Sequence, residues 1–166
     1  MGDDFYEAHN LKEKSYIFRD IRAREVGFAA FENLSQDALK IVRRDYEASD
    51  GTEVFLSFED QKEEHLYALL RLRKPSEDKP EYFKKIFKNT AFIREVHSYG
   101  SEINVGNAEG IGQHRGLGKA LIAEAERIAK DEWECAQMTI IAGVGTREYY
   151  KKWGYECVST YMNKKL

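Results

Sequence analysis

The stretch Gln113-His-Arg-Gly-Leu-Gly-Lys-Ala-Leu121 decides the expected fold, because it places two glycines at the start of an amphipathic helix. Gln113, Gly116 and Gly118 fit a Q/R-x-x-G-x-G/A pattern, in which a loop turns into a helix and leaves several backbone N–H groups unpaired. Those donors and the positive end of the helix dipole form an anion site suited to a pyrophosphate. A side chain at either glycine would hold phosphates away from the backbone. The alternative is an ordinary glycine-containing loop before a helix.

Length and composition indicate one folded domain. The chain has 166 residues, of which 42% are hydrophobic and 13% aromatic, and this supports a sizeable core. We expect a flexible lead over residues 1–14 and one domain over 15–166. A cytoplasmic protein is expected, because no apolar run is long enough to span a membrane and the first residues lack a signal-peptide pattern. Cys135 and Cys157 are too few for a zinc motif, so no metal site is expected and both are interpreted as buried thiols.

Hydrophobic periodicity and turn signals divide the chain into strands and helices. The expected strands cover 15–26, 54–58, 65–73, 92–99, 138–142 and 155–162. The expected helices cover 35–46, 81–89, the segment after Gly118, and 147–153. This order predicts an α/β fold with a mixed, mostly antiparallel sheet flanked by helices. A Rossmann domain fits poorly, because its glycine fingerprint follows the first strand. A Walker loop is excluded, because no Gly-Lys-Ser/Thr follows the glycines.

With these elements in place, the chain resembles the GNAT family of N-acetyltransferases. It is similar, more specifically, to the acetyltransferase domain of the Elongator catalytic subunit family, from about residue 15 to the C-terminus. The segments that carry this similarity are 21–27, 94–100, 113–118, 124–129, 143–150 and 154–155. Among them, the Gly-Val-Gly-Thr-Arg-x-Tyr-Tyr stretch that begins at Gly143 is specific.

The resemblance implies acetyl-CoA as the cofactor, with its pantetheine arm paired to the strand at 92–99 like an added strand. It implies tRNA as a partner, whose wobble uridine is modified with the help of a radical S-adenosylmethionine domain. That domain needs a cysteine cluster, which this sequence lacks. Asp20 and Ala23 stand where the family carries cysteines of a metal site. We therefore expect either part of a longer protein or a stand-alone relative, with a radical domain or Elongator-like subunits as further partners and no membrane.

The resemblance also assigns roles to individual residues. The implied cofactor-binding residues are Glu95, Val96, His97, Ser98, Gln113, Gly116, Leu117, Gly118, Lys119 and Tyr150. Glu95 and His97 alternate on one strand face, so either could be the general base. The alternative is that they orient the pantetheine or face solvent. Tyr150 is the preferred group to protonate the departing thiolate or to hydrogen-bond the thioester, and Tyr149 is left to packing. Without the resemblance, both tyrosines would be assigned to the core.

Arginines on two expected strands form a candidate RNA-binding patch. Alternation would place Arg22 with Arg24, and Arg71 with Arg73, on shared faces. Such a patch could neutralise RNA phosphates although the formal net charge of the chain is −3. The competing interpretation is that these arginines pair with nearby glutamates.

Two other functions stay open at this point. A lysine acetyltransferase that acts on histones or other proteins would use Glu95 as its natural base. A non-catalytic acyl-CoA-binding domain would use the same loop, because pyrophosphate binding and acyl transfer share it.

Overall fold

A computed structural model of the chain describes residues 20–26, 38–99 and 116–166. Its seven strands form one sheet in the order β1-β2-β3-β4-β5-β7-β6, in which only the β4–β5 pair is parallel. The strands are β1 (Leu39–Ala48), β2 (Gly51–Asp60), β3 (Leu66–Lys74), β4 (Thr90–Ser98), β5 (Gln137–Ile140), β6 (Glu156–Val158) and β7 (Tyr161–Lys165). The helices are α2 (Ile21–Arg24), α3 (Glu81–Ile86), α4 (Leu117–Arg127) and α5 (Arg147–Lys151). A π-helical turn, Ile128–Glu132, continues α4, and a 3-10 turn, Val144–Thr146, precedes α5. The predicted mixed, mostly antiparallel α/β sheet is confirmed.

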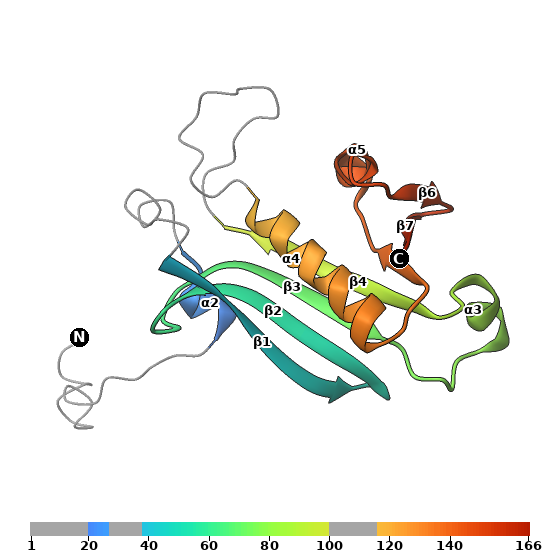
Figure 1. The fold of residues 1–166 in the computed structure, drawn as a ribbon, viewed down its shortest axis with the longest axis horizontal. Helices are drawn as coiled ribbons and strands as arrows, with labels where there is room; N and C mark the ends of the chain where they lie inside the picture. Colours follow the sequence, from blue (N-terminus) through green and yellow to red (C-terminus); the bar gives the residue numbers. More distant parts are fainter. Residues whose placement is uncertain (1–19, 27–37, 100–115) are drawn as a thin grey trace, which may run out of the picture.

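Helix α4 covers one face of the sheet (Figure 1). Its buried residues include Leu121 and Ala125, which belong to one core cluster with Leu56, Leu70 and Ile93 of the sheet. Burying one such leucine contributes roughly 2 kcal/mol to stability. The amphipathic stripe read from the sequence therefore fixes how α4 lies on the strands, and with it the position of the helix N-terminus.

The first hairpin differs from the sequence prediction. A helix was expected over 35–46, because Leu39, Val42 and Tyr46 have helical spacing; residues 35–37 of it lie outside the described part of the chain. The structure instead pairs all ten residues of β1 with β2. The turn explains this, since Ser49 and Asp50 both have positive φ (48° and 56°), as the two-residue turns that match strand twist require. The helix prediction is wrong because the turn and the cross-strand pairing outweigh local spacing.

The segment before the first gap also differs. A strand was expected over 15–26, of which residues 15–19 lie outside the described part of the chain. Residues 21–24 form the single-turn helix α2 instead. The Asp20 carboxylate caps this helix by accepting hydrogen bonds from the N–H groups of Arg22 and Ala23. The N-terminal lead predicted over 1–14 also lies outside the described residues.

The C-terminal strand is interrupted. One strand was expected over 155–162, but the chain turns at Ser159 (φ 57°) and forms β6 and β7. Cys157 lies on β6 and is exposed, whereas Cys135 is buried, so the prediction of two buried thiols holds only for Cys135. Among the described helices, none is both long and apolar enough to cross a membrane.

Candidate functional site

At the N-terminus of α4, the first backbone donors find no acceptor among the described residues. Gly116 caps the helix with φ 115°, a left-handed conformation that suits glycine, and no side chain caps the first turn. Ala120 donates the first hydrogen bond of the turn, 2.7 Å to the Gly116 carbonyl. The N–H groups of Leu117, Gly118 and Lys119 precede it and have no acceptor within the helix. The first turn carries no acidic residue, so it suits an anion. Gln113 lies outside the described residues.

Strands β4 and β5 pair over only part of their length. The parallel ladder joins residues 90–93 of β4 to residues 137–140 of β5. The Ile141 N–H adds a hydrogen bond of 3.1 Å to the Ile93 carbonyl. Beyond Ile93, the described residues provide β4 with no ladder partner on the β5 side, while β3 still pairs with it on the other side. The second half of β4 therefore has one open edge inside the sheet.

A β-bulge sets which backbone groups face this open edge. Arg71 pairs with Glu95 and Leu72 with Ile93, so Arg94 is the extra residue. The N–H of Tyr99 donates to the Tyr67 carbonyl on β3 at 2.9 Å. By strand alternation, the N–H and C=O groups of residues 96 and 98 point away from β3, toward the open edge. Val96 and Ser98 are thus the two residues of β4 that can pair with an extended ligand.

The open edge and the start of α4 lie next to each other. A Cβ atom at Gly118 would come within 3.2 Å of the Ser98 Oγ, so glycine permits this close approach. The structure therefore brings the glycine turn and the end of β4 together, as the sequence analysis expected for a cofactor that contacts both.

Glu95 and His97 lie on the face of the sheet opposite α4. Their side chains are 38% and 58% exposed, and the Glu95 Oε1 lies 3.2 Å from the His97 Nε2. Arg71 on β3 approaches the other carboxylate oxygen at 3.6 Å. The predicted shared face of Glu95 and His97 is confirmed. Both residues are open enough to meet a substrate.

These two side chains line a cavity of about 550 Å³ that sequence reasoning did not find. Glu25 and Tyr99 also line it. Burial and a hydrogen bond to Glu25 raise the pKa of Tyr99 to about 12, so its hydroxyl stays protonated at neutral pH. The Asp20 cap signals the start of helix α2 but does not place Glu25 beside β4, because that placement depends on contacts between residues far apart in the sequence.

Tyr150 is buried on α5, whereas its neighbour Tyr149 is 46% exposed. The Tyr150 ring packs edge-on against Tyr149 and Tyr155, with centroids 5.4 and 6.1 Å away. Burial raises the pKa of Tyr150, and the neighbouring Tyr149 adds to the shift. The hydroxyl is therefore a proton donor at neutral pH.

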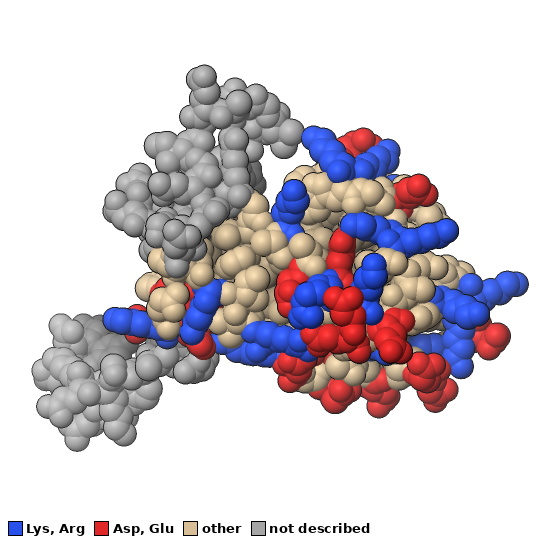
Figure 2. All heavy atoms as spheres, in the orientation of Figure 1, with Lys and Arg blue, Asp and Glu red and all other residues tan. Residues whose placement is uncertain are grey.

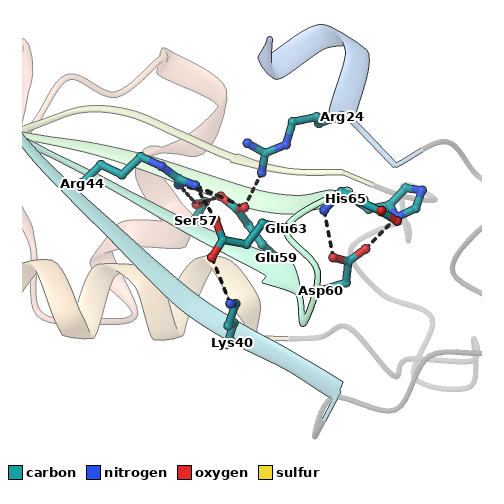
Figure 3. A network of polar contacts seen from close by, with 9 residues as sticks. Arg24, Lys40, Arg44, Ser57, Glu59, Asp60, Glu63 and His65 are labelled. Atoms are coloured by element: carbon teal, nitrogen blue, oxygen red, sulfur yellow. Dashed lines mark hydrogen bonds and ion pairs between the residues drawn. The ribbon is translucent and has the colours of Figure 1, made fainter. Parts of the chain in front are cut away.

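Two of the four arginines of the predicted RNA patch, Arg22 and Arg24, are not arranged as expected. Arg22 and Arg24 lie on a helical turn instead of a strand, so the expected shared strand face is wrong for this pair. Arg24 is buried and ion-paired with Glu59, which Arg44 and Ser57 also bind at 2.7 and 2.5 Å (Figure 3). Arg22 is exposed and pairs with Glu25.

Arg71 and Arg73 do share one face of β3, as alternation predicts. Both pair with Glu53, at 3.2 and 2.8 Å, and Glu53 is fully buried. Burial alone would raise the pKa of Glu53, but hydrogen bonds from Arg73, Tyr46, Arg94 and Arg71 hold it at about 2. Pairing with glutamates, the competing interpretation, describes all four arginines, because Arg22 pairs with Glu25, Arg24 with Glu59, and Arg71 and Arg73 with Glu53. Their RNA-binding role stays a prediction.

Comparison with known proteins gives relatives over nearly the whole chain. Elongator complex protein 3 of Dictyostelium discoideum is 45% identical over 94% of this chain and 28% of that protein. A tRNA uridine(34) acetyltransferase of Dehalococcoides mccartyi is 45% identical over 94% of this chain and 34% of that protein. The solved structure of archaeal Methanocaldococcus infernus Elp3 with an N-terminal deletion has a TM-score of 0.74 and 41% identity, covering 99% of this chain and 38% of that one. No family model matches the chain.

The archaeal structure thus shares the fold of this chain and confirms the predicted GNAT-type α/β fold. The chain spans about a third of the length of these relatives.

Proposed function

This chain is homologous to one segment of the Elongator complex protein 3 family, and we propose that it is the acetyl-CoA-dependent part of a tRNA wobble uridine acetyltransferase. Two named relatives are tRNA uridine(34) acetyltransferases, at 45% and 44% identity. The proposal extends their activity to this chain. We propose further that radical S-adenosylmethionine chemistry belongs to the part of the relatives that this chain does not match.

One observation carries the cofactor assignment: the donors of α4 lie next to the open edge of β4. Acetyl-CoA combines an anionic pyrophosphate with an extended arm that contains amide groups, and the two halves of this site suit those two parts. The N–H groups of Leu117, Gly118 and Lys119 would hold the pyrophosphate. Val96 and Ser98 would pair with the arm as an added strand. The bound cofactor supplies an activated acetyl thioester.

The side chains then divide the proton chemistry between them. Glu95 or His97 accepts a proton from the attacking group, because both side chains reach the cavity on the face opposite α4. The Tyr150 hydroxyl donates a hydrogen bond or a proton to the leaving sulfur, and the raised pKa keeps it in the donating form. Each of these roles belongs to the proposal.

Calorimetry with acetyl-CoA tests the cofactor site. Gly116→Glu should abolish binding, because a carboxylate there repels the phosphates. Gly116→Asn is the matched variant, since asparagine tolerates positive φ and adds no charge; it should bind more weakly than wild type but better than the glutamate variant. Gly145→Glu is the control, because its site has open space and no positive φ. Wild-type affinity in Gly116→Glu contradicts the proposal.

The acceptor is tested by acetyl-CoA hydrolysis with and without tRNA. Stimulation by tRNA supports the proposal. Acetylation of a lysine peptide without response to tRNA would instead make the chain a protein acetyltransferase. If acetyl-CoA binds tightly but stays intact in the presence of every acceptor, the chain would be a non-catalytic acyl-CoA-binding domain.

A further inference from the structure

A second pocket, of about 380 Å³, opens where β4 and β5 separate. Arg94 is the bulged residue at the start of the open half of β4, and Ile141 makes the last backbone contact between the two strands. Both line this pocket. The pocket therefore borders the open edge to which the acetyl-CoA arm is assigned. The inference drawn from it rests on that proposed function.

Positive charge exceeds negative charge at one wall of the pocket. Arg73 and Arg94 share the Oε1 atom of Glu53, at 2.8 and 2.6 Å, and Arg71 binds its Oε2 at 3.2 Å. The next carboxylate, Glu95, lies 3.6 Å from Arg71. Three guanidinium groups thus face two carboxylates. Because Arg94 is 41% exposed, its free edge can meet an anion from solvent.

Lys79 adds a further cation from the loop before α3. It lines the same pocket, and among the described residues it forms no ion pair. The adjoining helix α3 is also basic, with Lys84 and Lys85 in its last turn, and Lys and Arg side chains gather at this end of the molecule on the face that Figure 2 shows. A phosphate is the group that such a pair of cations, Lys79 and Arg94, would best bind.

The remaining wall is apolar and flat. The ring of Tyr161 lines the pocket and packs edge-on against Phe87, with centroids 5.2 Å apart. Phe92 stands beside it, also held by Phe87 at 5.1 Å. Ile141 is 54% exposed and adds an apolar side chain to this wall. Rings held from behind by an aromatic cluster form a fixed platform for a planar ligand.

We propose that this pocket binds one unstacked nucleotide of the RNA acceptor. Arg94 and Lys79 hold its phosphate, and Tyr161 and Ile141 contact the face of its base. Phosphate plus base stacking is the usual chemistry of single-stranded RNA recognition, and an acidic peptide would leave the aromatic wall unused. The pocket would thereby hold the RNA chain beside the acetyl-transfer site.

Fluorescence anisotropy with an anticodon stem–loop RNA tests the phosphate contacts. Lys79→Gln and Arg94→Gln should each weaken binding several-fold and lower the salt slope by about 0.7. Lys130→Gln is the matched control, because Lys130 is an exposed cation on the π-helical turn after α4 and lies outside the pocket. It should bind like wild type. Equal losses in all three variants would indicate general attraction and overturn the proposal.

The base contact needs its own variant. Tyr161→Leu keeps apolar volume but removes the ring, and it should weaken RNA binding at least about fivefold with an unchanged salt slope. Failure of the wild-type chain to bind the RNA, or wild-type affinity in these variants, would overturn the proposal. So would loss of acetyl-CoA affinity in Arg94→Gln, since the pocket would then hold the adenosine end of the cofactor. If wild-type protein binds RNA but not acetyl-CoA, the proposed cofactor site fails instead.

Discussion

Strand β2 and strand β4 treat their polar groups in opposite ways. On β2, Glu53 and Glu59 are both fully buried, and each is held by guanidinium groups. On β4, the backbone groups of Val96 and Ser98 face an edge where the described residues offer no ladder partner. The buried ion pairs of β2 hold the neighbouring strands and helix α2 together. The open edge of β4 leaves hydrogen-bonding capacity that a ligand can use.

Within one sheet, the buried carboxylates of β2 are thus part of the fold, whereas the open backbone groups of β4 are available to a ligand. A buried carboxylate without partners would be costly, so its guanidinium partners are part of the fold. Unpaired backbone groups in a strand interior are rare unless something binds them. We infer that the β2 charges govern stability and that the β4 edge governs cofactor affinity.

Removing Glu53 should have the largest effect. Glu53→Ala leaves Arg71, Arg73 and Arg94 crowded without their shared carboxylate, and should lower the free energy of unfolding by about 3–5 kcal/mol. Urea unfolding measures this. Glu47→Ala is the control, because Glu47 is exposed on the neighbouring strand. A loss below about 1 kcal/mol would mean that the cluster adds little to stability.

Acid should destabilise the fold by protonating the Glu53 carboxylate. The pKa of Glu53 falls from 4.5 to about 2 in the folded protein, so its ionised form stabilises the fold above pH 4.5. That stability, roughly 3 kcal/mol, is lost as the pH falls from 4.5 toward 2. Glu53→Gln should flatten the pH dependence of unfolding in that range. If Glu53→Gln and wild type show the same pH dependence of unfolding, other groups cause the acid sensitivity.

Removing Arg24 should cost less, because Glu59 keeps Arg44 and Ser57 as partners. Arg24→Met should lower the free energy of unfolding by about 2 kcal/mol, the typical worth of a hydrogen bond to a charged group. Arg22→Met, on the same helical turn but exposed, should have little effect. Thermal unfolding of the two variants checks the contrast. Equal midpoints would show that α2 is not anchored by the buried pair.

The sequence predicted the local geometry of the candidate site better than it predicted the first hairpin of the sheet. The glycine pattern around Gly116 and the alternation of Glu95 with His97 are local signals, and both appear as expected. The hairpin of β1 was missed because helical spacing in 35–46 competes with pairing between distant residues. The bulge at Arg94 was missed for the same reason, since it arises from the register between β4 and β3, in which Arg71 pairs with Glu95 and Leu72 with Ile93.

Gly118→Val should have the smallest effect on stability and a clear effect on affinity. Its Cβ would meet the Ser98 Oγ at 3.2 Å, so the start of α4 must shift slightly away from β4. Acetyl-CoA affinity should fall roughly tenfold, or about 1.4 kcal/mol. Gly143→Val, where a Cβ meets open space, should bind normally. Calorimetry compares the two, and equal affinities would argue against a shared helix–strand site.

Amide chemical shifts, measured by NMR during titration with acetyl-CoA, test the division between the two strands most directly. The amides of Val96, Ser98 and residues 117–119 should shift, because they lie at the proposed cofactor site and have no acceptor among the described residues. The amides of Glu53 and Glu59, which lie away from the open edge on β2, should stay unchanged. Shifts confined to β1 and β2, with none at Val96, Ser98 or the start of α4, would contradict the account.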